Sequence, residues 1–461
     1  MSWRNATVLA GTVASAGVVI GATRAGWTGG VAPPDGPFGL WRPADGDRGW
    51  YAVLTAVSIC ALAVAFVRLY RQATAGEVGV ASVAQAAVAW CLPVLPAPPL
   101  LSLDAYSYAA QGWMLLSRLD PYTAGPERLG AGPILDAVSP VWRATPAPYG
   151  PLALATLERV AVLGEGNLTA TVWLLRVVAV LAVAGTAVLA AVLSEPGRRA
   201  ATVALVAANP LTVLHLVGGV HLDALLAGLA VLTVLAVRRG WWTLAAVAAA
   251  TAFAVKLPGL VLVAYVLVGR ARADGVRAAG TAGVAAVTTF GYAALVPNGW
   301  GWLGALDVPG RIRHPYDPTT IVGWLLHQIT PGTLTGAIGI ARTLAAVFGA
   351  ALIAVLVWRA AAEEARAAAA LVGGALLVVA LAAPTVHAWY AVWGLALIAA
   401  GAAATSRRWL AILCVALCFT ALPDPLKNDP GGVALRLGLL AVAGAGWFVS
   451  RRAVAVREGT A

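Results

Sequence analysis

The sequence is poor in charge. Only 11% of its 461 residues are Asp, Glu, Lys or Arg, whereas about a quarter is usual in a soluble domain. Hydrophobic residues make up 60% of the chain, and its mean hydropathy is +0.83. Apolar runs long enough to cross a bilayer recur along the whole chain and leave no stretch for a large soluble domain. The composition therefore predicts an all-α, polytopic membrane protein.

Cysteine and lysine are also scarce. The four cysteines lie inside apolar runs, and none has metal-ligand spacing to a histidine. Only two lysines occur, so almost all of the 31 basic residues are arginines. Most of these form short pairs between apolar runs, which is the positive-inside pattern of membrane proteins. The net charge of +11 is thus explained by topology, and we expect no nucleic-acid partner.

Fourteen apolar runs divide the chain, and we predict about 14 transmembrane helices in a single integral membrane domain, 1–461. Runs 241–254 and 257–269 are short and meet at "VKLPG", so we predict a hairpin that reaches outward and back. The N-terminal run is interpreted as an uncleaved first span. The predicted runs are 6–23, 50–67, 79–97, 167–193, 200–216, 221–237, 241–254, 257–269, 277–296, 333–358, 367–383, 388–404, 407–422 and 431–450.

The distribution of charge orients these runs. With both termini in the cytoplasm, basic residues outnumber acidic ones in the inside connections, and the reverse holds outside. Two long connections, 98–166 and 297–332, then lie outside, provided that Tyr149–Gly164 forms an interfacial or re-entrant helix there. Long ordered loops usually carry function. We therefore expect a plasma-membrane protein with an extracytoplasmic catalytic loop, 98–166, that contains interfacial helices.

The unusual polar residues collect on this outer side, at span ends or in outer loops. Ionisable groups in membrane proteins usually mark a site, although longer outer loops would also collect more of them. The residues are Asp104, His215, His221, Asp223, Lys256, His314, Asp317 and His387.

The stretch "DAYSYAAQG" directly follows an apolar, proline-bearing run. Its residues Asp104, Tyr108 and Gln111 are spaced i, i+4 and i+7, which predicts one polar stripe on an interfacial helix. Such a stripe can face a wet cavity. The alternative is that Asp104 only caps the helix, because Asp is a favoured N-cap residue.

The turn "GGVHLDALL" holds His221 and Asp223 at the start of another helix. Asp223 is open to the same N-cap explanation, and a lone histidine is usually structural. The group loosely resembles a metal site but lacks an HExxH or paired-Asp motif. We assign no metal and no certain cofactor, and a divalent cation remains a minor alternative.

Cations and aromatic rings complete the candidate site. Lys256 lies at the tip of the short hairpin, where a cation needs an anionic partner or must snorkel to the interface. The segment "GRIRHPYDP" adds Arg313 and His314, which suit either a phosphate group or anionic lipid headgroups. Trp142 and Tyr149 are candidates for stacking on sugars, or else for anchoring at the interface.

The chemistry of the donor follows from the location of these residues. The chain has no P-loop, and the GxGxxG match in "NGWGWLG" lies in an outer loop with no strand before it. A group-transfer enzyme on the outer face needs a donor carried by lipid. A polyprenyl-phosphate sugar already has a good leaving group, so its transfer needs one base and positive charge near the phosphate. The second carboxylate of a glycoside hydrolase is not required.

Several motifs together carry a family resemblance: "DAYSYAAQG", "DPY", "PVWRATPAPYGPL", "NPL", "GGVHLDALL" and "PTVHAWYAVWGL", in this order over about residues 100–395. The chain resembles polyprenol-phosphate-mannose-dependent α-1,6-mannosyltransferases of the GT-C class. That resemblance implies an inverting hexosyltransferase of the outer leaflet. Its donor would be polyprenyl-phosphate mannose, and its acceptor a lipid-linked mannoside in lipomannan synthesis. Family members are expected to have Asn where Leu222 stands.

The resemblance also implies roles for the candidate residues. Asp104 matches the general base, and the other assignments are hypotheses built around it. For the donor phosphate the candidates are Lys256, Arg313 and His314; for sugar hydroxyls Tyr108 and Gln111; for the acceptor groove Trp142 and Tyr149; and for orienting the sugar or the base His221, Asp223 and His387.

Two other functions compete with this one. A transporter or flippase of lipid-linked sugars would also use broken helices, but it predicts polar residues along a path through both leaflets. Another GT-C activity, such as an arabinosyltransferase or a protein O-mannosyltransferase, shares the same general chemistry.

Overall fold

The computed structural model describes residues 3–27, 40–46, 48–311, 313 and 317–419. This described part is helical and contains no strand. In chain order the elements are α1 (Trp3–Arg24), α2 (Gly49–Thr74), α3 (Val80–Cys91), α4 (Asp104–Leu116), η2 (Pro126–Leu129), α5 (Pro133–Ala137), α6 (Pro140–Arg143), α7 (Pro151–Leu163), α8 (Leu168–Leu193), η3 (Pro196–Arg198), α9 (Arg199–Ala207), η4 (Thr212–Gly218), α10 (Asp223–Arg238), α11 (Trp242–Val255), α12 (Gly259–Ala273), α13 (Gly275–Ala293), η5 (Gly301–Ala305), α14 (Val308–Arg311), α15 (Pro318–Ile329), α16 (Leu334–Ala360), α17 (Ala365–Ala382), η6 (Ala388–Ala391), α18 (Val392–Gly401) and α19 (Ala404–Cys418).

A helix starts within a few residues of each predicted apolar run, except for the last run, 431–450, which lies outside the described residues. Five described helices are long and apolar enough to cross a membrane: α1, α2, α8, α16 and α17. The bent pair of η3–α9 with η4 would make a sixth span, while α3, α11 and η6–α18 are shorter. The all-helical membrane architecture is confirmed, whereas the number of about 14 spans is not.

One break in a predicted span has a clear local cause. Asn209 and Pro210 follow α9, and the chain resumes as the π-helix η4 with a bend of 55°. Pro210 has no N–H to continue the helix. The Asn209 side chain replaces the missing bonds, since its amide donates to the Leu205 carbonyl (2.6 Å) and its oxygen accepts from the Thr212 N–H (2.9 Å). The bend directs the chain into the turn that carries His221.

The surface of the long helices is apolar, as expected of contact with lipid. On α16, the side chains of Leu344, Val347, Phe348 and Leu352 are all exposed. Such a continuous exposed apolar face is rare on soluble monomers. The long apolar helices and this face together identify a membrane protein.

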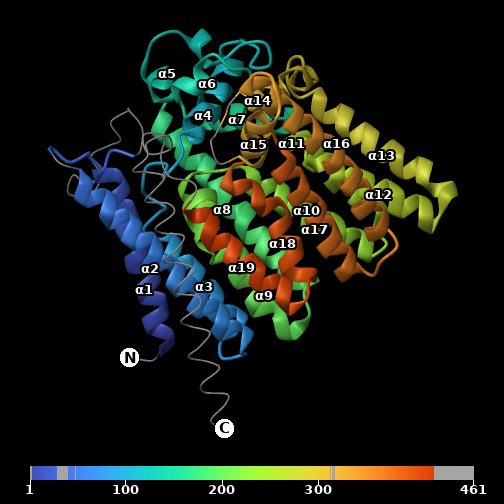
Figure 1. The fold of residues 1–461 in the computed structure, drawn as a ribbon, viewed down its shortest axis with the longest axis horizontal. Coiled ribbons are helices and arrows are strands. Elements are labelled where there is room, and N and C mark those ends of the chain that lie inside the picture. Colours follow the sequence, from blue (N-terminus) through green and yellow to red (C-terminus); the bar gives the residue numbers. More distant parts are fainter. Residues whose placement is uncertain (1–2, 28–39, 47, 312, 314–316, 420–461) are drawn as a thin grey trace.

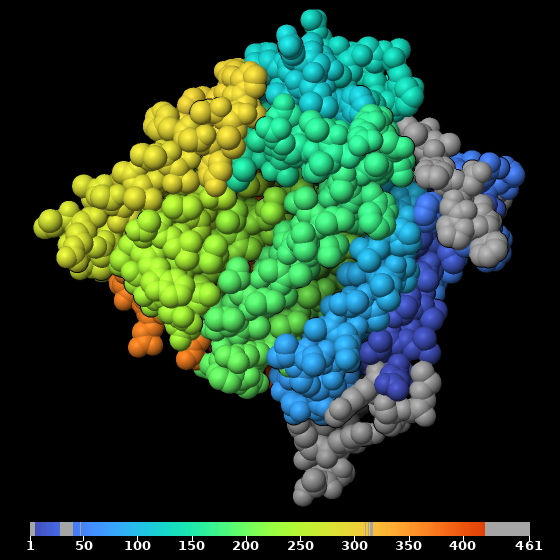
Figure 2. Space-filling view, turned by 180° about the vertical axis from the view of Figure 1, so that it is seen from behind, coloured from blue at the N-terminus to red at the C-terminus, as the bar shows by residue number. Residues whose placement is uncertain are grey.

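The catalytic-loop segment predicted at 98–166 forms a cap over one end of the helices. Helices α4 to α7 gather at the top of Figure 1 beside α14 and α15, and Figure 2 shows the same cap from behind. Helix α4 packs so closely on α7 that a Cβ at Gly112 would lie only 2.3 Å from the Leu157 carbonyl oxygen. Gly150 likewise rests on the tip of α11, with its N–H donating to the Val255 carbonyl (3.0 Å).

A buried arginine fixes the two segments that lead into the site. Arg176 of α8 is only 2% exposed, and its guanidinium donates to four backbone carbonyls. Two of them precede α4 and two end η4: Leu95 (2.8 Å), Ala97 (2.6 Å), Val217 (3.1 Å) and Gly218 (3.3 Å). The role of Arg176 is therefore internal and structural.

Candidate active site

A cavity of about 410 Å³ is lined by the capping loop, the junction of α11 and α12, the middle of α16 and the C-terminal end of α17. One wall is polar and is formed by Asp104, Ser107, Gln111, Trp142, Tyr149, Lys256 and His387. A second wall is apolar and includes Ala346, Gly349, Ala350, Ile353, Val379 and Ala382. The cavity thus offers a polar face to a headgroup and an apolar face to a hydrocarbon chain.

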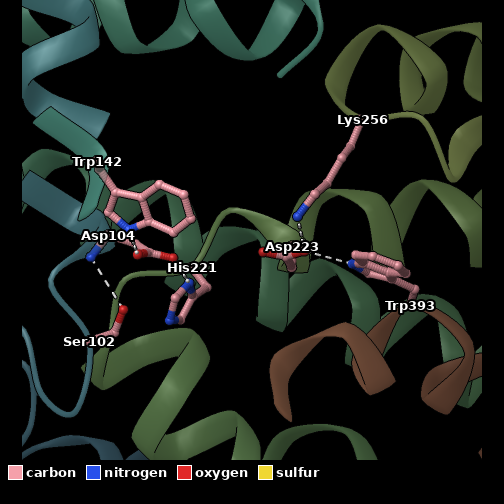
Figure 3. Close-up of polar contacts among 7 residues, drawn as sticks. All are labelled: Ser102, Asp104, Trp142, His221, Asp223, Lys256 and Trp393. Carbon is pink, nitrogen blue, oxygen red and sulfur yellow. Dashed lines mark hydrogen bonds and ion pairs between the residues drawn. The ribbon is translucent and has the colours of Figure 1, made fainter. Parts of the chain in front are cut away.

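Asp104 is the first residue of α4, and its carboxylate lines the cavity. Leu103 occupies the N-cap position, and no side chain caps this helix, so the explanation of Asp104 as an N-cap is wrong. Oδ1 accepts a hydrogen bond from Trp142 Nε1 (3.2 Å), and Oδ2 lies 3.8 Å from Nδ1 of the buried His221 (Figure 3). The side chain keeps 16% exposure, which leaves the carboxylate accessible from the cavity.

The predicted polar stripe on α4 is corrected in one position. Ser107 and Gln111 line the cavity with Asp104, at spacings of i+3 and i+7. Tyr108 is 1% exposed and turns away to meet the Tyr149 ring edge-on, with centroids 5.4 Å apart. Burial raises the pKa of Tyr108 well above its usual value, so its phenol stays neutral. Ser107 escaped the sequence analysis because small hydroxyl residues are common in membrane helices.

A second carboxylate lies deeper. Asp223 begins α10, but Leu222 is the N-cap residue and no cap hydrogen bond forms, so the capping explanation fails here too. Asp223 Oδ1 accepts from Lys256 Nζ (2.9 Å) and from Trp393 Nε1 (2.7 Å), as Figure 3 shows. The anionic partner that Lys256 was expected to need is therefore Asp223.

Aromatic rings surround the ammonium group of Lys256. Its Nζ lies 4.4 Å from the ring centroid of Tyr390, 5.0 Å from that of Trp393 and 5.6 Å from that of Tyr149. Each ring face attracts a cation. Burial is the largest single influence and lowers the pKa of Lys256, but Asp223, Tyr390 and Asp104 together outweigh it, so the pKa is raised above its usual value. Lys256 therefore carries a positive charge at the cavity wall.

Three further rings form a stack beside Asp104. Trp389 lies between His221, whose ring centroid is 3.8 Å away, and His387, at 4.6 Å. His387 lines the cavity and His221 approaches the Asp104 carboxylate, so the stack connects the two. The sequence predicted both histidines but not this arrangement, for which the signal was the aromatic run "HAWYAVW".

One predicted phosphate ligand, Arg313, is not brought to the cavity wall. Arg313 is exposed and donates to Thr335 Oγ1 (3.1 Å), and it is not among the lining residues. His314 lies outside the described residues. Within the described chain, no group of three or more His, Cys, Asp and Glu side chains is arranged to hold a metal ion.

Comparison with known proteins identifies the family of this chain. A family model described as "Alpha-(1->6)-mannopyranosyltransferase, N-terminal domain" matches residues 8–272, and the "MptB C-terminal domain" model matches residues 319–449. The chain belongs to the MptA/B family. This membership confirms the resemblance predicted from the motifs.

Individual members of the MptA/B family are also similar. Alpha-(1->6)-mannopyranosyltransferase A of Mycobacterium tuberculosis is 31% identical over 366 residues, which cover 75% of this chain and 70% of that protein. Alpha-(1->6)-mannopyranosyltransferase B of Corynebacterium glutamicum is 27% identical over 405 residues, covering 79% and 67% of the two chains. No solved structure matches the chain.

Proposed function

We propose that this protein is an inverting GT-C mannosyltransferase. It transfers mannose from polyprenyl-phosphate mannose to an α-1,6-mannan or phosphatidylinositol-mannoside acceptor at the extracytoplasmic face of the plasma membrane. One observation carries the proposal: a cavity-facing carboxylate, Asp104, and a cation, Lys256, share the polar wall of a cavity whose other wall is apolar. The names of its family members, which are α-(1→6)-mannopyranosyltransferases, support the sugar and the linkage.

In this reaction Asp104 accepts the proton of the attacking acceptor hydroxyl. The hydroxyl oxygen forms a bond to C1 of mannose while the bond between C1 and the phosphate oxygen breaks, and the electron pair of that bond leaves with the phosphate. Attack opposite the leaving group converts a β-linked donor into an α product. Lys256 stabilises the negative charge on the departing phosphate.

The apolar wall supports a donor carried by lipid. Ala346, Gly349 and Ala350 of α16 line it together with Val379 and Ala382 of the neighbouring α17, and these mostly small side chains leave room for a hydrocarbon chain. A soluble nucleotide sugar would gain nothing from such a wall. The polyprenyl chain lies against it, with its phosphate directed toward Lys256.

The distribution of polar groups favours an enzyme over a transporter. The ionisable residues that line the cavity, Asp104, Lys256 and His387, belong to the capping loop and to the connections that follow α11 and α17. The capping loop lies at one end of the helix bundle. A transporter needs polar groups along a path through both leaflets. Arabinosyl transfer and protein O-mannosylation share the chemistry of the site and are separated from this function by the choice of donor and acceptor.

The test is a transfer assay with protein purified into nanodiscs. Radiolabelled polyprenyl-phosphate mannose and a short α-1,6-mannoside acceptor are expected to give an elongated product, while polyprenyl-phosphate arabinose gives none. Asp104→Asn is expected to lower kcat by at least about a hundredfold. Asp136→Asn, on the exposed surface of the same loop, serves as the matched control. Full activity of Asp104→Asn would refute the role of the base, and exclusive use of the arabinose donor would refute the sugar.

A further inference from the structure

We propose that Asp223 is a positioning residue that holds Lys256 against the donor phosphate and does not itself touch either substrate. This inference rests on the proposed function and replaces the prediction that Asp223 binds sugar. The two carboxylates of the site then have different roles: Asp104 acts on the acceptor, and Asp223 acts on the donor through Lys256.

The burial of Asp223, Lys256 and Trp393 supports these different roles. Asp223 is only 3% exposed and is not among the described residues that line the cavity, whereas Lys256 and Trp393 both line it. The same oxygen, Oδ1 of Asp223, accepts from both Lys256 Nζ and Trp393 Nε1. Asp223 therefore binds its partners from the side away from the cavity, and substrate can reach Lys256 and Trp393 but not Asp223.

A lysine needs such support if it is to hold a phosphate at a fixed point. Its four-carbon side chain is flexible, and its ammonium group lacks the rigid fork of an arginine. Here aromatic rings lie beside the Lys256 ammonium group, and the Asp223 carboxylate binds it from the side away from the cavity. The backbone is tight as well, since a Cβ at Gly259 would lie 2.2 Å from the Phe253 nitrogen at the junction of α11 and α12.

The same turn also contacts the catalytic carboxylate. His221 lies two residues before Asp223, and its Nδ1 is 3.8 Å from Asp104 Oδ2. Val220, just before it, has a φ of +60°, which is uncommon for a β-branched residue and marks a constrained turn. The turn from Val220 to Asp223 thus sets the spacing between the base and the cation that receives the leaving phosphate.

The charge of Asp223 also affects the titration of Lys256. The ionisable groups that face Lys256 are Asp223 of α10, Asp104 of α4, Tyr390 of η6 and Tyr149 of the loop before α7. Burial favours the neutral amine, and Asp223 is the largest influence that opposes it. Loss of the Asp223 charge therefore lowers the pKa of Lys256, so Lys256 loses its proton at a lower pH than in the wild type.

The experiment measures kcat and the KM of each substrate between pH 6 and pH 10. For Asp223→Asn we expect the kcat/KM of the donor to fall about tenfold, because Lys256 holds the phosphate both before and during its departure, with little change in the KM of the acceptor at neutral pH. The alkaline fall of the donor kcat/KM should begin at lower pH than in the wild type. Asp223→Glu keeps the negative charge, so the alkaline fall of the donor kcat/KM should again begin at the pH at which it begins in the wild type.

A second variant keeps the test decisive if Asp223→Asn does not fold. Trp393→Phe keeps a ring over Lys256 but removes the N–H that Asp223 accepts, and we expect a smaller fall in the donor kcat/KM alone. An increase in the acceptor KM instead, or unchanged donor kinetics in both variants, would overturn the inference while wild-type mannose transfer still stands. Absence of transfer by the wild type would refute the proposed function itself.

Discussion

The indole of Trp142 donates its N–H to Asp104 across 38 residues of the capping loop, with Nε1 3.2 Å from Oδ1. Trp142 belongs to the short helix α6, while Asp104 begins α4. The bond fixes one carboxylate oxygen and so orients the other. Trp142 is therefore placed to position the base as well as to form a wall of the acceptor groove.

Replacing this indole tests that role. Trp142→Phe keeps an aromatic ring but loses the donor, and we expect kcat to fall about tenfold with the donor KM unchanged. Steady-state kinetics with varied donor provide the measurement. Trp300→Phe is the control, because Trp300 packs edge-on against Phe290 away from the cavity. Equal effects in both variants would argue against a specific role for Trp142.

The ring stack leads to a second prediction. His221→Asn removes the ring that lies on Trp389 and the nitrogen that approaches Asp104. We expect kcat to fall by about ten- to a hundredfold, because the carboxylate loses a polar neighbour in a buried setting. His327→Asn on α15, outside the cavity lining, is expected to retain activity. Wild-type kcat in His221→Asn would show that the stack has only a packing role.

Arg176 is expected to matter for stability. Arg176→Gln leaves several of its four carbonyl acceptors without their donor, and we expect a loss of about 2–4 kcal/mol in the free energy of unfolding. Thermal unfolding in detergent, followed by circular dichroism, measures the loss as a lower Tm. Arg199→Gln, at the exposed start of α9, is the matched control. An unchanged Tm for Arg176→Gln would contradict the assigned structural role.

The apolar wall is open to a direct test. A Cβ added at Gly349 would lie 3.0 Å from the Ala382 Cβ, so Gly349→Val adds bulk at a narrow point of the wall. We expect the KM of a long-chain donor to rise about tenfold and that of a short-chain analogue to change much less. Val347→Leu, on the exposed face of α16, controls for substitution in this helix. A uniform change for both donors would show that the tail does not occupy this wall.

The sequence was sufficient to predict the helical membrane architecture and most of the polar wall of the cavity. Asp104, Gln111, Lys256 and His387 were all found because ionisable or amide groups are rare in apolar surroundings and therefore conspicuous. The helix of Asp104 and Gln111 was predicted from its polar stripe, whereas the helices on either side of Lys256 were predicted from apolar runs, whose starts lie close to those of the observed helices.

Tertiary contacts were less accessible. The pairing of Asp223 with Trp393 joins residues 170 positions apart, and nothing local in either segment specifies it. The inward turn of Tyr108 depends on Tyr149, which the helical spacing of α4 does not reveal. Leu222, at the position where the resemblance led us to expect Asn, packs in the apolar cluster beneath the loop.

The docking of Gly150 on the tip of α11 bears on how the protein matures. Asp104, the proposed base, is translated more than a hundred residues before Lys256. The two come together only when the capping loop packs on the completed α11–α12 hairpin. A ribosome-bound chain that ends before residue 256 can already fold α4 and α7 but holds no complete pocket. The pocket is thus incomplete until the chain has been synthesised as far as Trp393, the last of its described lining residues.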